Sequence, residues 1–502
     1  MLHAGKIKVH ESAFLRILVV KMYLCRLQLA ATPLSITTMF DKKIYRARRE
    51  KLRQSLQGGI VLFPGNPEVP CNYAGNTYPF RQDSNFLYFF GLQKPDMYGV
   101  IDLDADKDFL YADDLTMDDI IWMGHLPSVS EMAAEAGITD TAPVSELKNL
   151  LHQAVLSRRK IHFVAPYNMQ VAQQMSEWMS VPVAKLKESQ SVELIKAIAE
   201  QRSIKGKEEL AEIEIAMDIA YKMHTTAMRM CKPGTHEYKI CGTMEGIALQ
   251  HHGSMSFAPI VSMNGQTLHN HDHGNLLKEG RMMVADVGAE AHSNYCSDIT
   301  RTTPVGGKFS TRQKEIYEIV LKANTSVIET LKPGLPYRDY HIAACKIIAQ
   351  GLKDLGLMKG DVEQAVQEGA HAMFMPHGLG HMMGLDVHDM ENMGENLFGY
   401  DDEIKRSDQF GLSYLRLGRR LQPGFVLTVE PGIYFIPALI DLWKSKDKFT
   451  QYINYDKVEA YKDFGGIRIE DDVLITEKAC KLLGQPIPKT VAEVEEACAR
   501  NE

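Results

Sequence analysis

Five side chains in the C-terminal half have the types and the order of metal ligands. Four are carboxylates and one is an imidazole: Asp286, Asp298, His381, Glu430 and Glu470. The carboxylates carry four negative charges, which a pair of divalent cations would balance. Two such ions that share bridging oxygens hold a hydroxide at neutral pH and stabilise both sides of a displacement at a carbonyl or phosphoryl centre. The set therefore predicts a two-metal hydrolase.

Each of these residues has a more ordinary interpretation when it is taken alone. A single Asp or Glu at the end of a strand is usually a solvated turn residue, and a single residue such as His381 could be a hydrogen-bonded core histidine. Matches to short motifs are prone to such false positives. The ligand interpretation depends on the joint pattern.

The segments that carry the carboxylates have the pattern of β-strands. One is an apolar run that ends in a carboxylate, one alternates and is rich in β-branched residues, and two carry a glutamate within a β-rich stretch: 281–288, 298–305, 425–435 and 465–476. Period-two alternation bounded by Gly, Pro and Asn is typical of strands. We therefore expect each carboxylate to lie on or beside a strand.

The two aspartates fit a hairpin. Asp286 and Asp298 lie twelve residues apart, with Gly288 and a polar segment between them. This spacing allows two strands to face one pocket. Carboxylates at such positions are costly to bury unpaired, and a bound metal removes that cost.

Together, five segments resemble the metallopeptidases of the pita-bread fold, which include aminopeptidase P, prolidase and, more distantly, methionine aminopeptidase. The segments occur in the family's order, at residues 78–86, 298–302, 376–389, 429–434 and 466–472. The resemblance extends from about residue 39 to the C-terminus. In one departure, the two aspartates are one residue further apart than in the commonest family pattern, a loop-length change that need not move the ligands.

The resemblance implies a role for each ligand. Asp286 would bind one metal through both carboxylate oxygens. Asp298 and Glu470 would bridge the two ions. His381 and Glu430 would complete the other metal site. Ligation dominated by oxygen, with one imidazole and no thiolate, favours Mn²⁺, with Co²⁺ or Zn²⁺ as substitutes, over a closed structural zinc site.

The resemblance also implies side chains that act on the substrate. His269 matches the family's substrate-pocket histidine, while His377 and His388 flank the ligand histidine in a glycine-rich segment. These histidines are expected to donate hydrogen bonds to the carbonyl oxygen as it gains charge and to help hold the proline region of the peptide. Glu430 is expected to shuttle a proton from the bridging water to the leaving proline nitrogen.

One arginine is expected to assist the ligands. Arg468 lies two residues before a ligand glutamate and projects to the same strand face, so it would support a carboxylate ligand. The alternative is a surface charge on a strand. Other histidines match no role and are interpreted as loop or helix residues: His251, His252, His271, His273 and His371.

Composition bounds the class of protein. The hydrophobic fraction of 45% and the charged fraction of 24% are typical of a soluble globular protein. The net charge of −8, without a basic block, argues against nucleic-acid binding. Eight cysteines without a CxxC pair indicate reduced thiols and a cytoplasmic location. No run of eighteen apolar residues exists, so no membrane span is expected.

The expected fold class is α+β, with four segments along the chain. Residues 39–200 alternate strands (59–64, 98–103, 160–165) with helices (44–56, 144–156), which predicts an α/β N-terminal domain. A helical pattern over 193–230 leads into a pita-bread catalytic domain at 201–490, where 314–331 and 340–355 are two further helices. Residues 491–502 form a tail. Residues 1–38 form a leader, interpreted as dispensable or as an overextended start rather than an export signal.

The expected reaction is metal-assisted hydrolysis of the bond before proline. This bond is a tertiary amide without an N–H, so peptidases that rely on that donor cleave it poorly. The segment 78–91 looks closer to aminopeptidase P, whereas the insertion at 434–465 is prolidase-like. We expect an Xaa-Pro aminopeptidase, with an Xaa-Pro dipeptidase as the close alternative and a metal-free binding scaffold as a remote one. By analogy with the family, a homodimer or homotetramer is expected.

Overall fold

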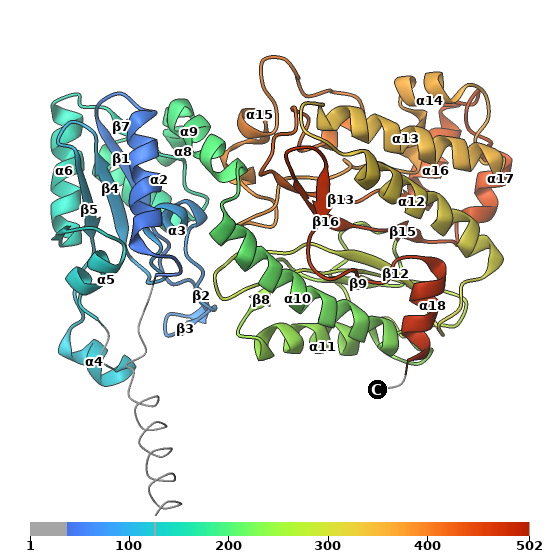
Figure 1. Ribbon diagram of the computed structural model, residues 1–502, viewed down its shortest axis with the longest axis horizontal. Helices are drawn as coiled ribbons and strands as arrows, with labels where there is room; N and C mark the ends of the chain where they lie inside the picture. Colours follow the sequence, from blue (N-terminus) through green and yellow to red (C-terminus); the bar gives the residue numbers. More distant parts are fainter. Residues whose placement is uncertain (1–37, 125–126, 501–502) are drawn as a thin grey trace, which may run out of the picture.

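The computed structural model describes residues 38–124 and 127–500, which form a smaller N-terminal body and a larger C-terminal body (Figure 1). The leader expected at 1–38 lies, apart from Thr38, outside the described residues. In the described part of the chain, none of the helices combines the length and the apolar character that a membrane span requires.

The N-terminal body is built on a mixed five-stranded sheet with the order β6-β5-β4-β1-β7. Its strands are β1 (Ile60–Pro64), β4 (Tyr98–Asp102), β5 (Lys107–Tyr111), β6 (Asp140–Ala142) and β7 (Ile161–His162). The central strands pair antiparallel, and the two outer strands pair parallel with their neighbours. A small hairpin lies apart from this sheet, formed by β2 (Pro70–Tyr73) and β3 (Asn76–Thr77).

Helices cover both faces of this sheet because successive side chains of a strand point to opposite faces, and each face has its own hydrophobic core. Ile60 and Leu62 of β1 pack in one hydrophobic cluster, and Val61 and Phe63 pack in another. The helices are α2 (Lys42–Gln54), α3 (Ser84–Phe90), α4 (Met117–Met123), α5 (Val129–Glu135), α6 (Val144–Leu156), α7 (Met169–Met179), α8 (Val183–Ser189) and α9 (Val192–Ser203). The strands and helices predicted for this region are therefore confirmed.

The C-terminal body places small antiparallel sheets between two layers of long helices. Its strands are β8 (Ser254–Met255), β9 (Ile260–Ser262), β10 (Met282–Asp286), β11 (Ala289–Glu290), β12 (Thr300–Pro304), β13 (Val426–Val429), β14 (Gly432–Tyr434), β15 (Gly466–Arg468), β16 (Asp471–Ile475) and β17 (Cys480–Leu482). Its helices are α10 (Lys207–Met230), α11 (Glu237–Gln250), α12 (Thr311–Thr330), α13 (Tyr337–Asp354), α14 (Val362–Glu368), α15 (Glu395–Phe398), α16 (Pro437–Ser445), α17 (Tyr455–Val458) and α18 (Val491–Ala499). Short 3-10 turns are η1 (Ala370–Met373), η2 (Glu391–Met393), η3 (Leu412–Tyr414) and η4 (Glu459–Tyr461).

The two helix layers repeat one local motif. The pair α10 and α11 lies on one side of the strands, and the pair α12 and α13 lies on the other (Figure 1). A Lys-Pro-Gly turn follows the first helix of each pair and ends at Gly234 or Gly334, with φ of 83° and 89°. Each glycine N–H donates to a distant leucine carbonyl, of Leu277 or Leu421. The C-terminal body thus consists of two related halves around one set of strands.

The segment expected as a C-terminal tail contains a packed helix. Helix α18 covers most of 491–502, and its buried side chains are Val494 and Ala497. It contacts α10 and α12, so it closes one end of both helix layers.

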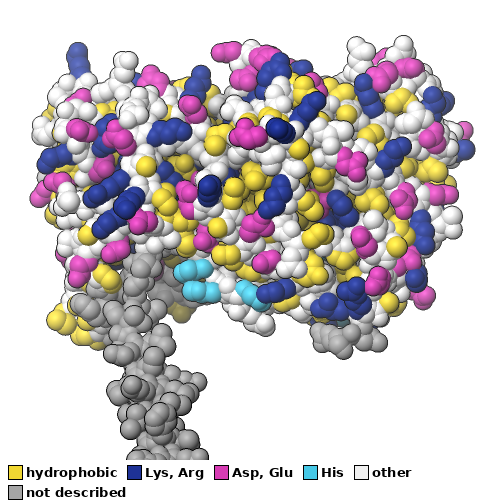
Figure 2. All heavy atoms as spheres, viewed as in Figure 1, with side chains coloured by type: hydrophobic (Ala, Val, Ile, Leu, Met, Phe, Trp, Pro, Cys, Tyr) yellow, Lys and Arg dark blue, Asp and Glu magenta, His cyan; other side chains and the backbone are white. Residues whose placement is uncertain are grey.

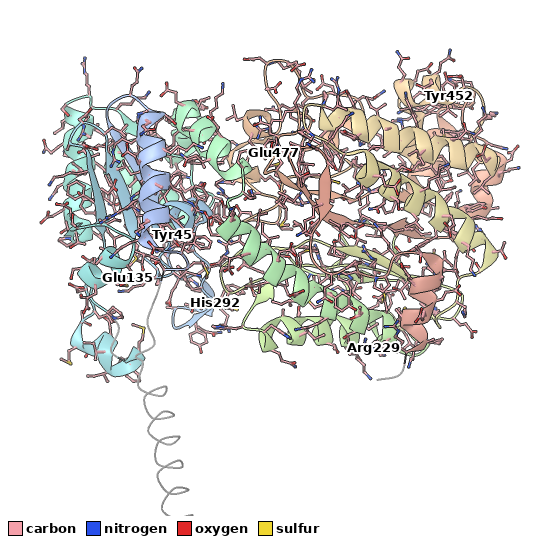
Figure 3. The ribbon with its side chains drawn as sticks, viewed as in Figure 1. Tyr45, Glu135, Arg229, His292, Tyr452 and Glu477 are labelled. Carbon is pink, nitrogen blue, oxygen red and sulfur yellow. The ribbon has the colours of Figure 1, made fainter. Side chains whose placement is uncertain are left out.

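The two bodies share a packed junction, and side chains fill the space between them (Figure 3). Tyr45 of α2 is buried there. Phe40 lies between Tyr45 and Tyr295, with ring centroids 6.2 and 6.1 Å apart. Nε of Arg81 lies 2.9 Å from a carboxylate oxygen of Glu290. The N-terminal body is therefore in direct contact with the hairpin that carries the aspartates.

Candidate metal centre

The first pair of carboxylates lies on the predicted hairpin. Strand β10 ends at Asp286 and pairs antiparallel with β12, so that Asp286 faces Thr300. Asp298 lies two residues before Thr300, and its N–H donates to Oδ2 of Asp472 at 2.9 Å. The expected hairpin is confirmed, with the short strand β11 in its connection.

The second pair of carboxylates lies where two strand pairs meet. Strand β13 pairs with β16, and β14 pairs with β15. Glu430 falls between β13 and β14, and Glu470 falls between β15 and β16. The N–H of Glu470 donates to the carbonyl of Thr300 at 3.1 Å, which joins this hairpin to the first one.

The histidine ligand lies in a loop that runs along β13. The N–H of Thr428 donates to the carbonyl of His381, whose own N–H donates to Oγ1 of Thr428. A Cβ at Gly380 would come within 2.1 Å of the Thr428 carbonyl, so only glycine allows this approach. Nδ1 of His381 donates to the Met382 carbonyl, and Nε2 lies 3.3 Å from Oδ2 of Asp298.

The five predicted ligands converge. Ligand atoms of Asp286, Asp298 and Glu470 lie within 4.8 Å of one another, and so do those of His381, Glu430 and Glu470. Two adjacent groups of three ligands therefore share Glu470. This is the arrangement that two neighbouring ions with a bridging carboxylate require.

The charge of this cluster fits divalent cations. Asp298 and Glu470 are almost fully buried, and burial together with the neighbouring carboxylates raises the pKa of both well above the usual range. Oδ1 of Asp286 and Oδ1 of Asp298 are buried and find no hydrogen-bond partner in the part of the chain that the structure describes. Buried carboxylate oxygens without partners are costly, and two divalent ions would satisfy them.

Arg468 connects the cluster to its surroundings. Its guanidinium donates to Oδ2 of Asp286 at 2.5 Å, to Oγ1 of Thr300 at 3.1 Å and to the hydroxyl of Tyr434 at 2.8 Å. Oγ1 of Thr300 in turn donates to Oε2 of Glu470 at 2.6 Å. Arg468 is buried, which excludes the alternative of a solvated surface charge.

His377 is held on both of its ring nitrogens. Nδ1 lies 2.7 Å from the Gly378 carbonyl and donates to it, so Nε2 accepts from the hydroxyl of Tyr434 at 2.9 Å. Burial, with Arg468 nearby, lowers the pKa of His377 to about 3. His377 is thus neutral at pH 7, and in this arrangement its ring orients Tyr434.

His388 lies against the ligand histidine and an arginine. Its ring centroid is 4.3 Å from that of His381. Nδ1 lies 2.6 Å from Nη1 of Arg416 and 2.7 Å from Oε2 of Glu391. Glu391 also pairs with Arg416, so the side chains of His388, Arg416 and Glu391 form one polar cluster beside the ligand histidine.

A cavity of about 750 Å³ opens beside the cluster. The five predicted ligands, the three predicted substrate histidines and Arg468 all line it or lie at its base. His271, interpreted from the sequence as a loop residue, also lines it. Apolar walls come from Phe257, Phe410 and Leu439.

The other histidines without a predicted role lie elsewhere. His252 stacks on His292, with ring centroids 3.9 Å apart. Figure 2 shows histidines gathered on the surface, and Figure 3 places His292 there. Nδ1 of His273 lies 3.1 Å from the Val261 carbonyl. These positions do not line the cavity.

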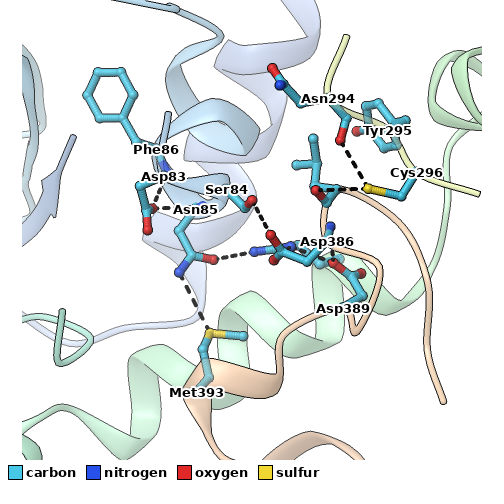
Figure 4. A network of polar contacts seen from close by, with 12 residues as sticks. Asp83, Ser84, Asn85, Phe86, Asn294, Tyr295, Cys296, Asp386, Asp389 and Met393 are labelled. Atoms are coloured by element: carbon cyan, nitrogen blue, oxygen red, sulfur yellow. Dashed lines mark hydrogen bonds and ion pairs between the residues drawn. The ribbon is translucent and has the colours of Figure 1, made fainter. Parts of the chain in front are cut away.

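A network from the N-terminal body holds the His388 loop (Figure 4). Arg202 donates to Asp386 at 3.0 Å and to Asp389 at 2.5 Å, and Ser84 donates to Asp386 at 2.6 Å. Lys205 donates to the other oxygen of Asp389 at 2.8 Å. The loop on either side of His388 is thus tied to the first body.

Sequence reasoning assigned no role to several of these residues. Thr300 and Tyr434 lie inside segments that carry the family resemblance, so their place near the ligands could have been predicted from the sequence. Arg202 and Asp389 lie 187 positions apart, and no local pattern pairs them.

Two family models match the chain. The model described as metallopeptidase family M24 matches residues 211–477, and the model described as aminopeptidase P, N-terminal domain matches residues 45–162. The first covers the strands and helices that carry the metal centre. The second covers most of the N-terminal sheet.

Curated relatives and solved structures match over most of their length. The chain is 32% identical to a human Xaa-Pro dipeptidase, covering 91% of this chain and 93% of the relative. It is 34% identical to a probable Xaa-Pro aminopeptidase of Aspergillus clavatus, covering 90% and 96%. Its structure resembles the aminopeptidase PepP of Pseudomonas aeruginosa, with a TM-score of 0.75, 27% identity and coverage of 92% and 99%. It also resembles E. coli aminopeptidase P with the inhibitor Pro-Leu, with a TM-score of 0.75, 28% identity and coverage of 91% and 98%. The expected α+β pita-bread fold with an N-terminal α/β domain is confirmed.

Proposed function

This chain belongs to metallopeptidase family M24, and from that premise we propose that it is an Xaa-Pro aminopeptidase. It is a metallopeptidase that cleaves Xaa-Pro bonds. The proposed reaction removes the N-terminal residue from peptides with proline at the second position. The observation that carries the proposal is the convergence of five ligand side chains at the base of an open cavity. The metal-free scaffold alternative loses its basis, because a scaffold would lack part of this set.

The proposed cofactor is a pair of divalent ions, most suitably Mn²⁺, with Co²⁺ or Zn²⁺ as substitutes. Oxygen-rich ligation with one imidazole supports this choice. When bound, the ions would supply an activated water and polarise the scissile carbonyl. Asp286 would serve one ion, His381 and Glu430 the other, while Asp298 and Glu470 would lie between them.

Side chains around the ions would transfer the proton and stabilise the developing charge. Glu430 lines the cavity, and burial raises its pKa, so it can accept a proton and pass it to the leaving proline nitrogen. His388 and His269 would donate to the carbonyl oxygen as negative charge develops. His377 would act through Tyr434, which Arg468 also holds.

The shape and charge of the cavity support an aminopeptidase. A volume of about 750 Å³ exceeds the space that two small residues need, so longer peptides have room. A dipeptidase needs a free cation for the nearby C-terminal carboxylate. Arg406 and Arg416 line the cavity, but Arg406 pairs with Glu395 and Arg416 pairs with Glu391.

The second candidate is an Xaa-Pro dipeptidase. It is favoured by those same arginines, because release of one carboxylate partner would free a cation for the substrate. The name of the human relative agrees with this candidate. Cleavage of the bond before proline is common to both.

We further propose a cytoplasmic homodimer or homotetramer. All seven cysteines in the described residues are free, which suits a reducing compartment. Helix α4 exposes Met117, Ile121 and Trp122, and an exposed apolar group of this kind supports self-association.

The test compares Gly-Pro with Arg-Pro-Pro on the Mn²⁺-loaded protein, with products identified by mass spectrometry. Arg-Ala-Ala is the matched peptide without proline. Release of arginine from Arg-Pro-Pro, with no cleavage of Gly-Pro or Arg-Ala-Ala, supports the aminopeptidase. Fast cleavage of Gly-Pro with an intact tripeptide establishes the dipeptidase. No cleavage of either peptide after metal reloading overturns both.

A further inference from the structure

A second cluster of potential ligands lies away from the metal centre. His341 and Cys345 are one turn apart on α13 and share a face of that helix. His371 reaches the same point from η1. Nε2 of His341 lies 3.4 Å from Sγ of Cys345, and one ligand atom from each of the three residues lies within 4.8 Å of the others.

These three side chains are almost fully buried, with exposed fractions of 1% for His341, 0% for Cys345 and 3% for His371. Among the described residues, Nδ1 of His341 and both ring nitrogens of His371 lack a partner with good hydrogen-bond geometry, although the Val366 carbonyl lies near His371. Leaving such groups unpaired in an apolar interior is costly. A hydrogen bond between the thiol and His341 satisfies only one of the four ring nitrogens, so it does not explain why the other three are buried here.

The protonation states suit metal binding. Burial lowers the pKa of His341 to about 3 and that of His371 to about 4, although the nearby Val366 carbonyl opposes the second shift. Both imidazoles are therefore neutral at pH 7, which is the form that binds metals. Burial raises the pKa of Cys345, so the thiol keeps its proton until an ion displaces it.

The separations also suit a shared ion. Zinc-like bonds of about 2.0–2.1 Å to nitrogen and about 2.3 Å to sulfur place two tetrahedral ligand atoms about 3.6 Å apart. The observed 3.4 Å between His341 and Cys345 is close to that value. The remaining pairs, all within 4.8 Å, need a contraction of at most about 1.4 Å to reach the tetrahedral separations.

We propose that His341, Cys345 and His371 form a second metal site that binds one thiophilic ion. It shares no residue with the hydrolytic centre. Helix α13 and η1 lie behind the cavity wall, where the Phe374 carbonyl accepts from the N–H of Tyr434 at 2.9 Å. An ion bound there would fasten η1 to α13 and stabilise the folded chain.

Charge and ligand number favour Cu⁺ over Zn²⁺. One thiolate and two neutral imidazoles give a net charge of zero with Cu⁺, but +1 with Zn²⁺, and an unbalanced charge is costly in an apolar core. Structural zinc also takes four ligands, whereas this cluster offers three. Binding would form a metal–sulfur bond and release the thiol proton to solvent, without electron transfer.

The test uses the full chain with Mn²⁺ already bound at the hydrolytic centre. Cu⁺ is titrated anaerobically against a chromophoric Cu⁺ chelator, and Zn²⁺ is titrated in parallel against its own chelator. The variants are Cys345→Ala and, as the matched buried control, Cys231→Ala, since Cys231 is similarly buried but joins no ligand cluster among residues 38–124 and 127–500. We expect wild type and Cys231→Ala to bind one ion that Cys345→Ala does not bind. Mn²⁺ content should be equal in all three.

Equal binding by wild type and Cys345→Ala, or no binding of either ion by wild type, would overturn the site. If the wild type binds Zn²⁺ but not Cu⁺, and Cys345→Ala binds neither, the site is supported and the charge argument for Cu⁺ is overturned. X-ray absorption at the metal edge of the wild-type protein is a second measurement that needs no variant. It should show one sulfur at about 2.3 Å with imidazole scattering, and a spectrum without sulfur would refute the proposal.

Discussion

Nη2 of Arg202 lies 2.5 Å from Oδ1 of Asp389, and both side chains are almost fully buried at the junction of the two bodies. Asp389 follows His388 directly in the chain. The ion pair therefore links the last helix of the N-terminal body to a loop that lines the cavity. Through this link, the N-terminal body would position His388, a proposed substrate-binding residue.

Removing the Asp389 carboxylate tests this link. Asp389→Asn leaves Lys205 buried without its charge partner and leaves Arg202 with Asp386 alone, which should lower the free energy of unfolding by about 3 kcal/mol or more. The loop around His388 should also loosen, so kcat/KM should fall even where the protein is fully folded. Glu403→Gln is the control, because its ion pair with Arg420 is exposed to solvent and contributes little to stability. Urea unfolding and kinetics measure both effects, and a variant as stable as the control would refute the link.

The ion pair between Arg202 and Asp389 also makes the free energy of unfolding depend on pH. Burial alone would raise the pKa of Asp389, but Arg202 and Lys205 outweigh it and hold the pKa below its usual range. A lowered folded-state pKa contributes stability that is complete above the unfolded-state pKa of about 3.9 and is lost as pH falls through the folded-state pKa. The stability difference between wild type and Asp389→Asn should thus be constant from pH 7 to about pH 5 and shrink below about pH 4. A difference that grows on acidification would contradict the assignment.

Asp298→Asn should raise the stability of the apo protein relative to wild type and lower that of the Mn²⁺-loaded protein relative to wild type. In the apo protein the carboxylates of Asp298, Asp286 and Glu470 repel one another, so removal of one charge should raise the melting temperature. With Mn²⁺, the wild type should gain stability, whereas the variant should gain little, because it lacks a predicted bridging ligand. Asp441→Asn, at an exposed position, is the control. Calorimetry with metal analysis measures the effect, and full activity of Asp298→Asn would sink the two-metal assignment.

Thr300 offers a matched pair of substitutions. Its hydroxyl donates to Glu470 at 2.6 Å and accepts from Arg468, so it fixes the direction of a predicted bridging carboxylate. Thr300→Val keeps the shape and removes the hydroxyl, and it should weaken metal affinity by about 10- to 100-fold. Thr300→Ser keeps the hydroxyl and should bind metal almost as wild type does. Equal Mn²⁺ affinity in the two variants would show that the hydroxyl does not orient Glu470.

Trp122 tests the proposed assembly. Its side chain is 86% exposed on α4, and tryptophans at the centre of an interface commonly contribute 2 kcal/mol or more, that is about 30-fold in affinity. Trp122→Ala should therefore shift the wild-type dimer or tetramer towards monomer in sedimentation velocity. Leu156→Ala, an exposed apolar residue on α6, should leave assembly unchanged. A wild type that stays monomeric at all concentrations would remove the proposal.

The sequence supported the strands and the five converging ligands because both depend on local pattern. Asp286 and Glu470 stand in β-rich runs whose alternation can be recognised without a structure. The links between distant segments could not be predicted in this way. Arg202 pairs with Asp389 because two bodies pack together, and the neutral state of His377 depends on burial and on the nearby Arg468. His371 was interpreted as an ordinary histidine, since nothing local places it beside α13.

The repeated Lys-Pro-Gly turn at Gly234 and Gly334 bears on the ancestry of the metal centre. The first half contributes Asp286 and Asp298, and the second contributes Glu430, Glu470 and the only imidazole of the set. Such a division is what fusion of two copies of one ancestral unit would leave, each having once supplied half of a shared centre. After such a fusion the halves would be free to diverge, and the two proposed metal positions would no longer be equivalent. One proposed position has only oxygen ligands and the other includes a nitrogen, so the ions should leave them one after the other.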